Sequence, residues 1–362
     1  MKKLFILTGE LSAFNYAKEL VPLLKEDLKI YGAFINNIPG AQRVIDSRKL
    51  TAFGVFESLL KLPSLIKAKK EITDFLKREN IDAVLLIDFP GFNLKIAEIA
   101  KTLGIKVFYF ISPKFWAWGE RRVKKVKENV DKMFVIFPFE VDFYKKWGIE
   151  VTYVGNPLID IVKPTKTKEN FYQAFSITPP LYALLPGSRE TEIKYLLEPM
   201  LKAVKNVKGT FAIPVASSID RKLIEKKVKA IKPNILLLPE NERYNLLFYS
   251  QTGIIASGTA SLEAAIAGLP HIVLYKLNPL TFFIAKRVVK IPFVSLPNII
   301  AGEKVVPELL QQKVSEKNIL KTFEYLNENR EAIKLNLKNK VTSKLHGNAL
   351  EKLANEIKRE LL

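Results

Sequence analysis

Short apolar runs alternate with longer segments of helical periodicity through the first part of the chain. This alternation has the spacing of βαβ units. Strands that are apolar throughout are typical of a parallel sheet covered by helices on both faces, so we predict a doubly wound α/β domain. The predicted strands are Leu4–Thr8, Ala83–Asp88, Lys106–Ile111, Met133–Ile136 and Val151–Val154. The predicted helices are about Ala13–Lys25, Leu59–Lys77, Leu94–Leu103, Glu120–Asn129 and Glu140–Trp147.

A second alternating set follows a polar segment that ends in Thr178-Pro179-Pro180. Its strands are predicted at Tyr182–Leu185, Thr210–Val215, Ile235–Leu238, Gly253–Ala256 and Ile272–Tyr275. After Ser315 the chain is helical in pattern and heavily charged, and this tail is expected to be able to cross back onto the first domain. The expected organisation is two doubly wound domains facing a cleft: residues 1–160, a linker 161–180, residues 181–335, and a C-terminal helix 336–362.

The amino-acid composition limits the kinds of catalytic and metal site that the chain can contain. The 362 residues, 48% of them hydrophobic, suffice for two α/β domains with large cores. The absence of Cys excludes disulfides, thiol nucleophiles and Cys-ligated metals. With only His271 and His346, a His-based zinc site is not expected.

The net charge of +20 fits three explanations: binding to nucleic acid, docking on anionic lipid, or a Lys-rich thermophile composition. No stretch has the pattern of an RNA-binding module or a helix-turn-helix, so a membrane surface ranks first and nucleic acid last. Met1-Lys2-Lys3 leads straight into a strand, unlike a signal peptide, and no apolar run reaches the roughly 18–20 residues of a spanning helix. We expect a cytoplasmic protein or one peripheral on the cytoplasmic face of the membrane.

The segment from Phe53 to Ile66 is largely apolar and is followed by lysines. This pattern suits an interfacial segment that dips into lipid headgroups while Lys pairs with anionic lipid. Alternatively, it is a buried helix that covers the sheet. The expected membrane-contacting residues are Val55, Phe56, Leu59, Leu60 and Leu62.

The most informative motif is Ser257-Gly258-Thr259, which lies between an apolar strand and a helix rich in Ala. A small-residue turn that opens a helix offers free backbone N–H groups and the positive end of the helix dipole, so it can hold a phosphate. Glu263, one helical turn further on, can accept hydrogen bonds from sugar hydroxyls. A site that binds diphosphate and ribose together suggests a nucleotide-sugar, and hence a glycosyltransferase.

A similar turn, LLPGSRE, follows the first strand of the second domain. Gly187 permits a tight turn, Ser188 can cap the next helix, and Arg189 can make a planar, two-pronged contact with phosphate. The alternative is a plain strand–helix turn with a surface Arg. The companion turn at Ser257 favours phosphate.

The run VSLPNIIAGEKVVPELLQ supplies further polar residues at a strand end, including Asn298, Glu308 and Gln311. Residues at this spacing can bind a base and a ribose. Alternatively, the run is a loop that leads into a capped helix.

In the first domain, LIDFPGFN ends a buried strand with Asp88 at its tip. A carboxylate there could deprotonate an acceptor hydroxyl, or it could cap the following helix. The loop ISPKFWAWGERR places Trp116 and Trp118 at another strand end, where they could wall a sugar or acyl pocket. Ordinary core packing is the alternative, and we favour it for one of the two.

Together these segments resemble the lipid-A-disaccharide synthase family. The matching segments are TGELS, IDFPGFN, ISPKFWAW, FPFE, VGNPLID, LLPGSRE, SGTASLEA and VSLPNIIAGEKVVPELLQ, in family order over residues 8–311. The resemblance implies a GT-B fold with two Rossmann-like domains, with the acceptor and membrane on the first and the UDP-sugar donor on the second. It also implies an inverting transfer from UDP-2,3-diacylglucosamine to 2,3-diacylglucosamine 1-phosphate, giving the lipid A disaccharide 1-phosphate and UDP. No metal or other cofactor is implied, and family enzymes are peripheral on the inner membrane.

The resemblance assigns roles residue by residue. Asp88 matches the family's proposed general base. The donor site comprises Gly187, Ser188, Arg189, Ser257, Gly258, Thr259, Glu263, Asn298, Glu308 and Gln311. The acceptor site or pocket comprises Glu10, Ser12, Asn93, Trp116, Trp118 and Asn156.

Three departures from the family pattern fall on the acceptor side. Ala13 and Phe14 replace a Gly and an Asp, Gly91 replaces a second carboxylate, and Asn156 replaces a His. They leave open a non-catalytic relative that keeps UDP-sugar or lipid binding. A second alternative is another GT-B enzyme, either a UDP-sugar epimerase or a transferase with an undecaprenyl acceptor, and the apolar segment Phe53–Ile66 argues against a soluble-sugar epimerase. The oligomeric state stays open, a homodimer included.

Overall fold

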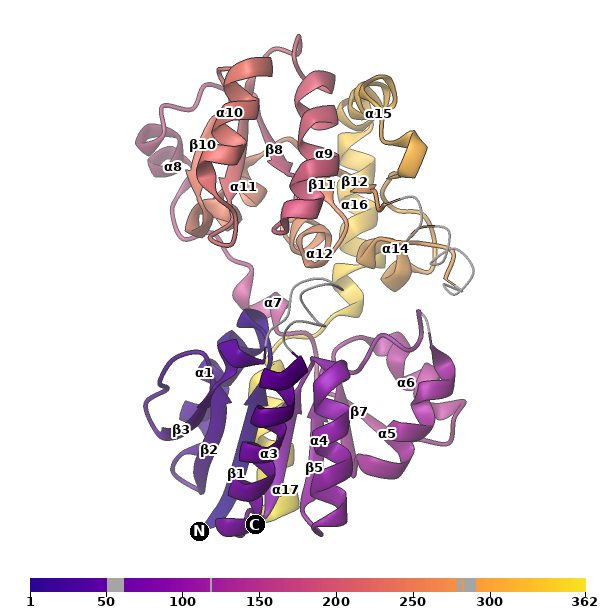
Figure 1. The fold of residues 1–362 in the computed structure, drawn as a ribbon. Helices are drawn as coiled ribbons and strands as arrows, with labels where there is room; N and C mark the ends of the chain where they lie inside the picture. The colour runs from indigo at the N-terminus through magenta and orange to yellow at the C-terminus, as the bar shows by residue number, and fades with distance from the viewer. Residues whose placement is uncertain (51–61, 118, 279–281, 283–290) are drawn as a thin grey trace. The chain divides into compact units, whose positions relative to one another are not determined.

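The computed structural model describes residues 1–50, 62–117, 119–278, 282 and 291–362. Within them the chain forms two compact units (Figure 1). Unit 1 comprises Met1–Pro157 together with His346–Leu362, and unit 2 comprises Leu158–Leu345.

Unit 1 is built on a seven-stranded parallel sheet with the strand order β3-β2-β1-β4-β5-β6-β7. The order reverses between β1 and β4, which makes that point the topological switch of the sheet. The buried strands β1, β4 and β5 are apolar because helices cover both faces. The strands are β1 (Lys2–Thr8), β2 (Leu28–Phe34), β3 (Ala41–Asp46), β4 (Ala83–Ile87), β5 (Lys106–Phe110), β6 (Lys132–Val135) and β7 (Val151–Tyr153).

The last helix of the chain completes unit 1 by packing against α1, and α3 and α4 cover the front of the sheet in Figure 1. Glu360 in this helix pairs with Lys106 at 2.5 Å and Lys132 at 2.8 Å, so the last helix is also bound to strands β5 and β6. The helices are α1 (Leu11–Leu24), α3 (Leu62–Arg78), α4 (Pro90–Thr102), α5 (Val123–Asn129), α6 (Pro138–Lys145) and α17 (Ala349–Leu361), with 3₁₀ turns η1 (Ser47–Lys49) and η2 (Glu120–Arg122).

Unit 2 repeats the same plan with a six-stranded parallel sheet in the order β10-β9-β8-β11-β12-β13. Its switch point lies between β8 and β11. The strands are β8 (Leu181–Leu185), β9 (Thr210–Val215), β10 (Leu236–Pro239), β11 (Thr252–Ala256), β12 (His271–Tyr275) and β13 (Glu308–Leu310). The helices are α7 (Leu158–Ile161), α8 (Lys168–Ala174), α9 (Glu190–Ala203), α10 (Arg221–Ile231), α11 (Arg243–Tyr249), α12 (Thr259–Ile266), α14 (Leu296–Ala301), α15 (Glu316–Glu328) and α16 (Arg330–Lys340), with 3₁₀ turns η3 (Glu240–Glu242), η4 (Gln311–Lys313) and η5 (Thr342–Lys344).

The segment expected to be a linker, 161–180, belongs to unit 2. It contains α8, whose N-terminus is capped by Thr167, with the Thr167 Oγ1 accepting from the Asn170 N–H at 3.3 Å. Phe171 in this helix is fully buried in the core of unit 2. The segment is polar in composition, yet it forms a short helix whose Phe171 and Tyr172 pack against the core of unit 2.

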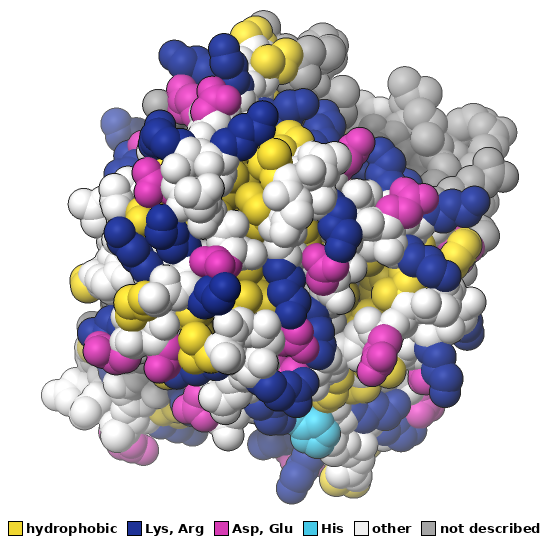
Figure 2. All heavy atoms as spheres, turned by 90° about the horizontal axis from the view of Figure 1, so that it is seen from below, with side chains coloured by type: hydrophobic (Ala, Val, Ile, Leu, Met, Phe, Trp, Pro, Cys, Tyr) yellow, Lys and Arg dark blue, Asp and Glu magenta, His cyan; other side chains and the backbone are white. Residues whose placement is uncertain are grey.

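No helix in the described ranges is long and apolar enough to cross a membrane. Four expected membrane-contacting residues, Val55, Phe56, Leu59 and Leu60, lie outside the described residues, and Leu62 begins α3 with its side chain not described. Figure 2 shows Lys and Arg side chains spread over one face of the molecule among acidic and apolar ones, without a single basic patch.

Candidate active-site residues

The turn between β11 and α12 presents an open helix N-terminus. Gly258 and Thr259 are exposed, and Gly258 has φ 151°, a conformation that favours glycine. The strand end is held by the Ser257 N–H, which donates to the Leu274 carbonyl at 2.8 Å. Because the first N–H groups of an α-helix have no intrahelical partner, this exposed turn is suited to binding an anion.

The turn between β8 and α9 requires a glycine. Gly187 has φ +115°, and a Cβ there would lie 2.2 Å from Glu192 Oε2. That carboxylate oxygen accepts hydrogen bonds from the Ser188 and Arg189 N–H groups at 2.9 and 3.2 Å. Arg189, not Ser188, is the N-cap of α9, so the predicted capping role of Ser188 is wrong. The Arg189 side chain is 68% exposed, with Nη1 3.5 Å from Glu192 Oε1, and an exposed guanidinium is able to contact a phosphate.

These two turns lie at the switch point of unit 2. Strands β8 and β11 are paired, with Leu185 beside Ile255, and each turn follows directly at the carboxyl end of its strand. In open α/β sheets, ligands bind outside the carboxyl ends of the strands where the order reverses. The sequence had placed both motifs at strand ends, and the topology brings them together.

Glu263 lies within α12 and is 4% exposed. Its Oε1 accepts from Arg243 Nη2 at 3.0 Å and lies 3.4 Å from the Tyr244 hydroxyl. Burial raises the pKa of Glu263, and the positive charge of Arg243 acts against that shift. Sequence reasoning missed Arg243 because it lies twenty positions away, at the start of α11, in a segment without a motif.

The polar residues of the third donor segment form hydrogen bonds within the protein. Asn298 is fully buried, and its amide contacts the Val305 N–H, the Val306 N–H and carbonyl, and Glu308 at 2.8–3.0 Å. Glu308 also accepts from the Ser295 N–H and hydroxyl at 2.9 and 2.7 Å. The Gln311 amide pairs with the backbone of residue 277. Asn298 and Glu308 thus fix the backbone on either side of α14, and Gln311 fixes the backbone that follows β12.

In unit 1, Asp88 follows β4 in a strained turn. Asp88 and Phe89 both have φ 49°, a left-handed conformation that costs of order 1–3 kcal/mol per non-glycine residue. The Asp88 carbonyl accepts from the Tyr109 hydroxyl at 2.6 Å and Asn93 Nδ2 at 2.7 Å, which offsets that strain. Phe89 is the N-cap of α4 with no side-chain cap bond, so Asp88 does not cap the helix.

The environment of Asp88 favours its protonated form. Burial raises the pKa of this carboxyl, and the nearby charge of Glu10 raises it further, while Lys114 acts in the opposite direction. Glu10 follows β1, so the two carboxyl groups lie at the switch point of unit 1. A carboxylate with a raised pKa at such a point is suited to accept a proton.

The other predicted acceptor residues spread along the same edge of the sheet. Asn93 is buried beneath the Asp88 turn, and Ser12 is exposed in the first turn of α1. Asn156 is buried beyond β7, with Nδ2 donating to the Ile136 carbonyl at 3.3 Å. The structure thus brings Glu10, Asp88 and Asn93 together and leaves Asn156 several strands away. Trp118 lies outside the described residues.

Glu140 is a buried carboxyl group that the sequence analysis did not single out. It is 2% exposed and accepts from the Ser112 hydroxyl at 2.5 Å, Trp116 Nε1 at 3.2 Å, and two backbone N–H groups at 3.0 and 3.2 Å. Burial raises its pKa to about 7 in spite of these donors. Its position, third in a helix that begins at Pro138, is the capping-box signal that could have revealed it.

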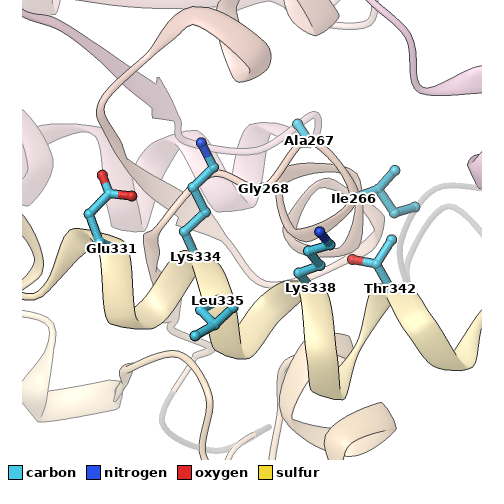
Figure 3. A pocket seen from close by; sticks show the side chains of 8 residues that line it. All are labelled: Ile266, Ala267, Gly268, Glu331, Lys334, Leu335, Lys338 and Thr342. Atoms are coloured by element: carbon cyan, nitrogen blue, oxygen red, sulfur yellow. The ribbon is translucent and has the colours of Figure 1, made fainter.

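A hollow of about 520 Å³ lies at the C-terminal end of α12, opposite the turn at Gly258. In Figure 3, Lys334 and Lys338 extend from α16 towards the end of α12 at Gly268, and Leu335 points away. None of the predicted site residues lines this hollow. Within the described ranges, no cluster of three or more His, Asp or Glu residues could hold a metal ion.

Solved structures share this fold. UDP-GlcNAc 2-epimerase from Neisseria meningitidis, bound to UDP-GlcNAc, matches with a TM-score of 0.68 at 16% identity, over 99% of this chain and 100% of that one. MurG from Acinetobacter baumannii matches with a TM-score of 0.62 at 14% identity, over 99% and 100%. At such identities the likeness establishes the fold alone, and it is the predicted GT-B arrangement of two parallel-sheet α/β domains.

Sequence comparison is more specific. The chain is 40% identical over 340 residues to the lipid-A-disaccharide synthase of Aquifex aeolicus, covering 92% of each chain. It is 39% identical over 348 residues to that of a Sulfurihydrogenibium species, covering 90% of this chain and 89% of the relative. The family model described as lipid-A-disaccharide synthetase matches residues 4–361. The chain therefore belongs to the lipid-A-disaccharide synthase family of glycosyltransferases.

Proposed function

We propose that this protein condenses UDP-2,3-diacylglucosamine with 2,3-diacylglucosamine 1-phosphate, giving the β-1,6-linked lipid A disaccharide 1-phosphate and UDP. One observation carries the proposal: the two sheet switch points hold complementary chemistry. Unit 2 presents an exposed helix N-terminus beside the Arg189 guanidinium, and unit 1 presents Asp88, a carboxyl group with a raised pKa. One is suited to a diphosphate and the other to a hydroxyl that must lose a proton.

The proposed reaction is a single inverting displacement. The 6-hydroxyl oxygen of the acceptor forms a bond to the anomeric carbon of the donor, and the bond from that carbon to the β-phosphate oxygen breaks. Asp88 takes the proton of the hydroxyl. The negative charge that develops on the departing UDP is stabilised by the N-terminus of α12 and by Arg189.

The other predicted residues bind the rest of the donor or support the groups that take part in the reaction. We assign Ser257, Gly258 and Thr259 to the diphosphate and Glu263 to the ribose. Gly187 and Ser188 shape the turn that carries Arg189, while Asn298, Glu308 and Gln311 hold the backbone that borders the site. On the acceptor side, Asn93 supports the Asp88 turn, and Glu10, Ser12, Trp116, Trp118 and Asn156 belong to the acceptor region.

The direct test is to incubate the purified protein with both lipid substrates in detergent and EDTA, and to follow UDP and disaccharide by mass spectrometry. We expect equal amounts of both products. Disaccharide formation would also show that Ala13, Phe14, Gly91 and Asn156 are compatible with this acceptor. Binding of UDP without disaccharide would instead indicate a divergent relative that uses another acceptor or none.

We also propose that the start of α3 contacts the anionic surface of the inner membrane. The described part of this helix exposes Ile66, at 60%, next to the exposed Lys67, Lys69 and Lys70. An apolar side chain beside several lysines favours an interface between headgroups and acyl chains. Replacement of the three lysines by Glu should abolish sedimentation with phosphatidylglycerol vesicles, whereas replacement of Lys124, Lys125 and Lys127 in α5 should leave it intact. Equal effects of the two triple variants would contradict this assignment.

A further inference from the structure

Glu263 and the donor turn share one face of α12. Thr259 begins this helix and Glu263 lies four positions later, so the two side chains project from the same face about 6 Å apart along the axis. A diphosphate at the N-terminus would therefore place the next part of the nucleotide, its ribose, beside Glu263. This geometry rests on the proposed donor site.

The Glu263 carboxyl is held through one of its two oxygens. Arg243 Nη2 donates to Oε1 at 3.0 Å and also lies 3.2 Å from the Tyr244 hydroxyl, which is itself 3.4 Å from Oε1. Among the described residues, no hydrogen bond is made to Oε2. One oxygen is thus fixed by the protein while the other keeps its lone pairs for a ligand.

Arg243 is the main influence that opposes the rise in the pKa of this carboxyl group. Glu263 is almost fully buried, and burial disfavours its charged form. The groups that face it are Arg243, Tyr244 and Glu240, and of these only Arg243 is a cation. Arg243 itself has a buried Nε without a partner in the described part of the chain, so its guanidinium is held at an energetic cost by its position against Glu263.

We propose that Arg243 is a positioning residue of the donor site, which together with Tyr244 holds the Glu263 carboxylate so that Oε2 accepts hydrogen bonds from the two ribose hydroxyls of UDP. Arg243 does not touch the ligand in this arrangement. It acts only through the orientation and charge of Glu263. Rotation of the Glu263 carboxyl would take Oε2 out of reach of the hydroxyls, and its protonation would weaken the hydrogen bonds that it accepts.

Binding of two nucleotides separates this role from a structural one. Affinities for UDP and for 2′,3′-dideoxyuridine 5′-diphosphate are measured by calorimetry for the full-length wild type, R243Q, R243K, E263Q and the double variant R243Q/E263Q. We expect R243Q to weaken UDP binding by roughly tenfold to a hundredfold, as for loss of hydrogen bonds to a charged group, and to change binding of the dideoxy ligand little. R243K should lose less than R243Q. The double variant should bind UDP as E263Q does, because Arg243 acts through that residue.

The pH dependence supplies a second readout. Without Arg243 the pKa of Glu263 should rise further, so R243Q should regain affinity for UDP as the pH is raised, with no such gain for the dideoxy ligand. Equal losses for the two nucleotides, or additive effects of R243Q and E263Q, would overturn the proposal. If R243Q does not fold, R243K provides the same comparison. Failure of the wild type to bind UDP is a distinct result, which would overturn the donor site itself.

Discussion

The carboxyl groups of the candidate sites in the two units have different partners. In unit 2, Glu263 is paired with Arg243, and Glu192 and Glu308 accept hydrogen bonds from backbone N–H groups. In unit 1, Asp88 and Glu140 both have a raised pKa, and in the described ranges neither forms an ion pair with Lys or Arg. Burial raises the pKa of Glu263 as well, so the difference between Glu263 and Asp88 is the paired cation, Arg243, that opposes the shift at Glu263.

This difference suits the two carboxyl groups to different parts of a transfer reaction. A carboxylate that is paired with a cation can orient hydroxyl donors, so Glu263 is suited to the binding of a nucleotide. A buried carboxyl group without a paired cation gains a proton more readily, so Asp88 is suited to deprotonation of an acceptor. Because unit 1 also carries the departures from the family pattern, its proton chemistry is the part of the comparison most worth testing.

The largest effect is expected from Asp88→Asn. The amide keeps the size of the side chain and cannot take a proton, so kcat should fall by about 10²–10⁴-fold, the usual contribution of general base catalysis. The affinity for UDP should not change, because the donor residues are in unit 2. Steady-state kinetics and calorimetry check the two parts.

A matched control is Asp82→Asn, at the opposite end of β4. Asp82 pairs with Lys2 at 2.9 Å, and its pKa is lowered, so it is a carboxyl group paired with a cation. Turnover should be unaffected by its loss. Normal turnover in Asp88→Asn would remove Asp88 as the base and end the proposed division of roles.

The next largest effect is expected from Glu140→Gln, on the pH dependence of the free energy of unfolding. Its pKa rises from the ordinary 4.5 to about 7 on folding. Between these values the folded protein binds a proton that the unfolded chain releases, so the free energy of unfolding should fall with rising pH, by about 3 kcal/mol in all, and level off above pH 7. Glu140→Gln, which does not titrate, should remove this decline in urea unfolding at pH 5 and pH 8.

Glu360 offers the contrast of opposite sign. Hydrogen bonds from Lys106 and Lys132 lower its pKa well below the usual range, so its contribution to stability is present at neutral pH and is lost as the pH falls. Glu360→Gln should therefore destabilise the protein at pH 8 and have less effect at low pH. The same pH response in both variants would contradict the difference between buried and paired carboxyls.

A smaller effect is expected from Gly187→Ala in unit 2. The φ of +115° and the contact of a new Cβ with Glu192 should cost about 1–3 kcal/mol, either as stability or as displacement of Glu192 from the α9 N-terminus. If the turn moves, Arg189 moves with it, and UDP binding weakens. Gly91→Ala is the control, since a Cβ there meets nothing within 4 Å. Similar UDP affinity in both variants would show that donor binding does not depend on the Gly187 turn.

The sequence predicted the parts of the fold that have strong local signals. Fully apolar strands such as Leu181–Leu185 were found, whereas the edge strands β3 and β13 were missed because AQRVID and ELL are short and largely polar. β2 was missed as well, although it is largely buried. Its run LKIYGAF carries a Lys near the start and a central Gly, which weaken a strand pattern.

The residues of the candidate site also divide into those with a local sequence signal and those without one. Asp88 and the two glycine turns follow strands directly, so a motif at a strand end suffices to find them. The pairs Arg243–Glu263 and Ser112–Glu140 join segments about twenty to thirty residues apart, and no periodicity encodes such contacts. Sequence reasoning could not foresee that Asn298 is enclosed by its own hydrogen bonds, because that depends on how residues 294–308 fold back.

The smallest effect, and the most direct probe of how unit 1 sets its proton chemistry, is expected from Glu10→Gln. The negative charge of Glu10 raises the pKa of Asp88, so its removal should lower that pKa towards the ordinary range, while burial keeps part of the shift. Because Asp88 must be ionised to act as a base, kcat/KM falls at low pH, and the acidic limb of the profile should move to lower pH in Glu10→Gln. Glu19→Gln, an exposed change further along α1, should leave the limb in place. A limb that does not move in Glu10→Gln would mean that Glu10 has no part in setting the pKa of the base.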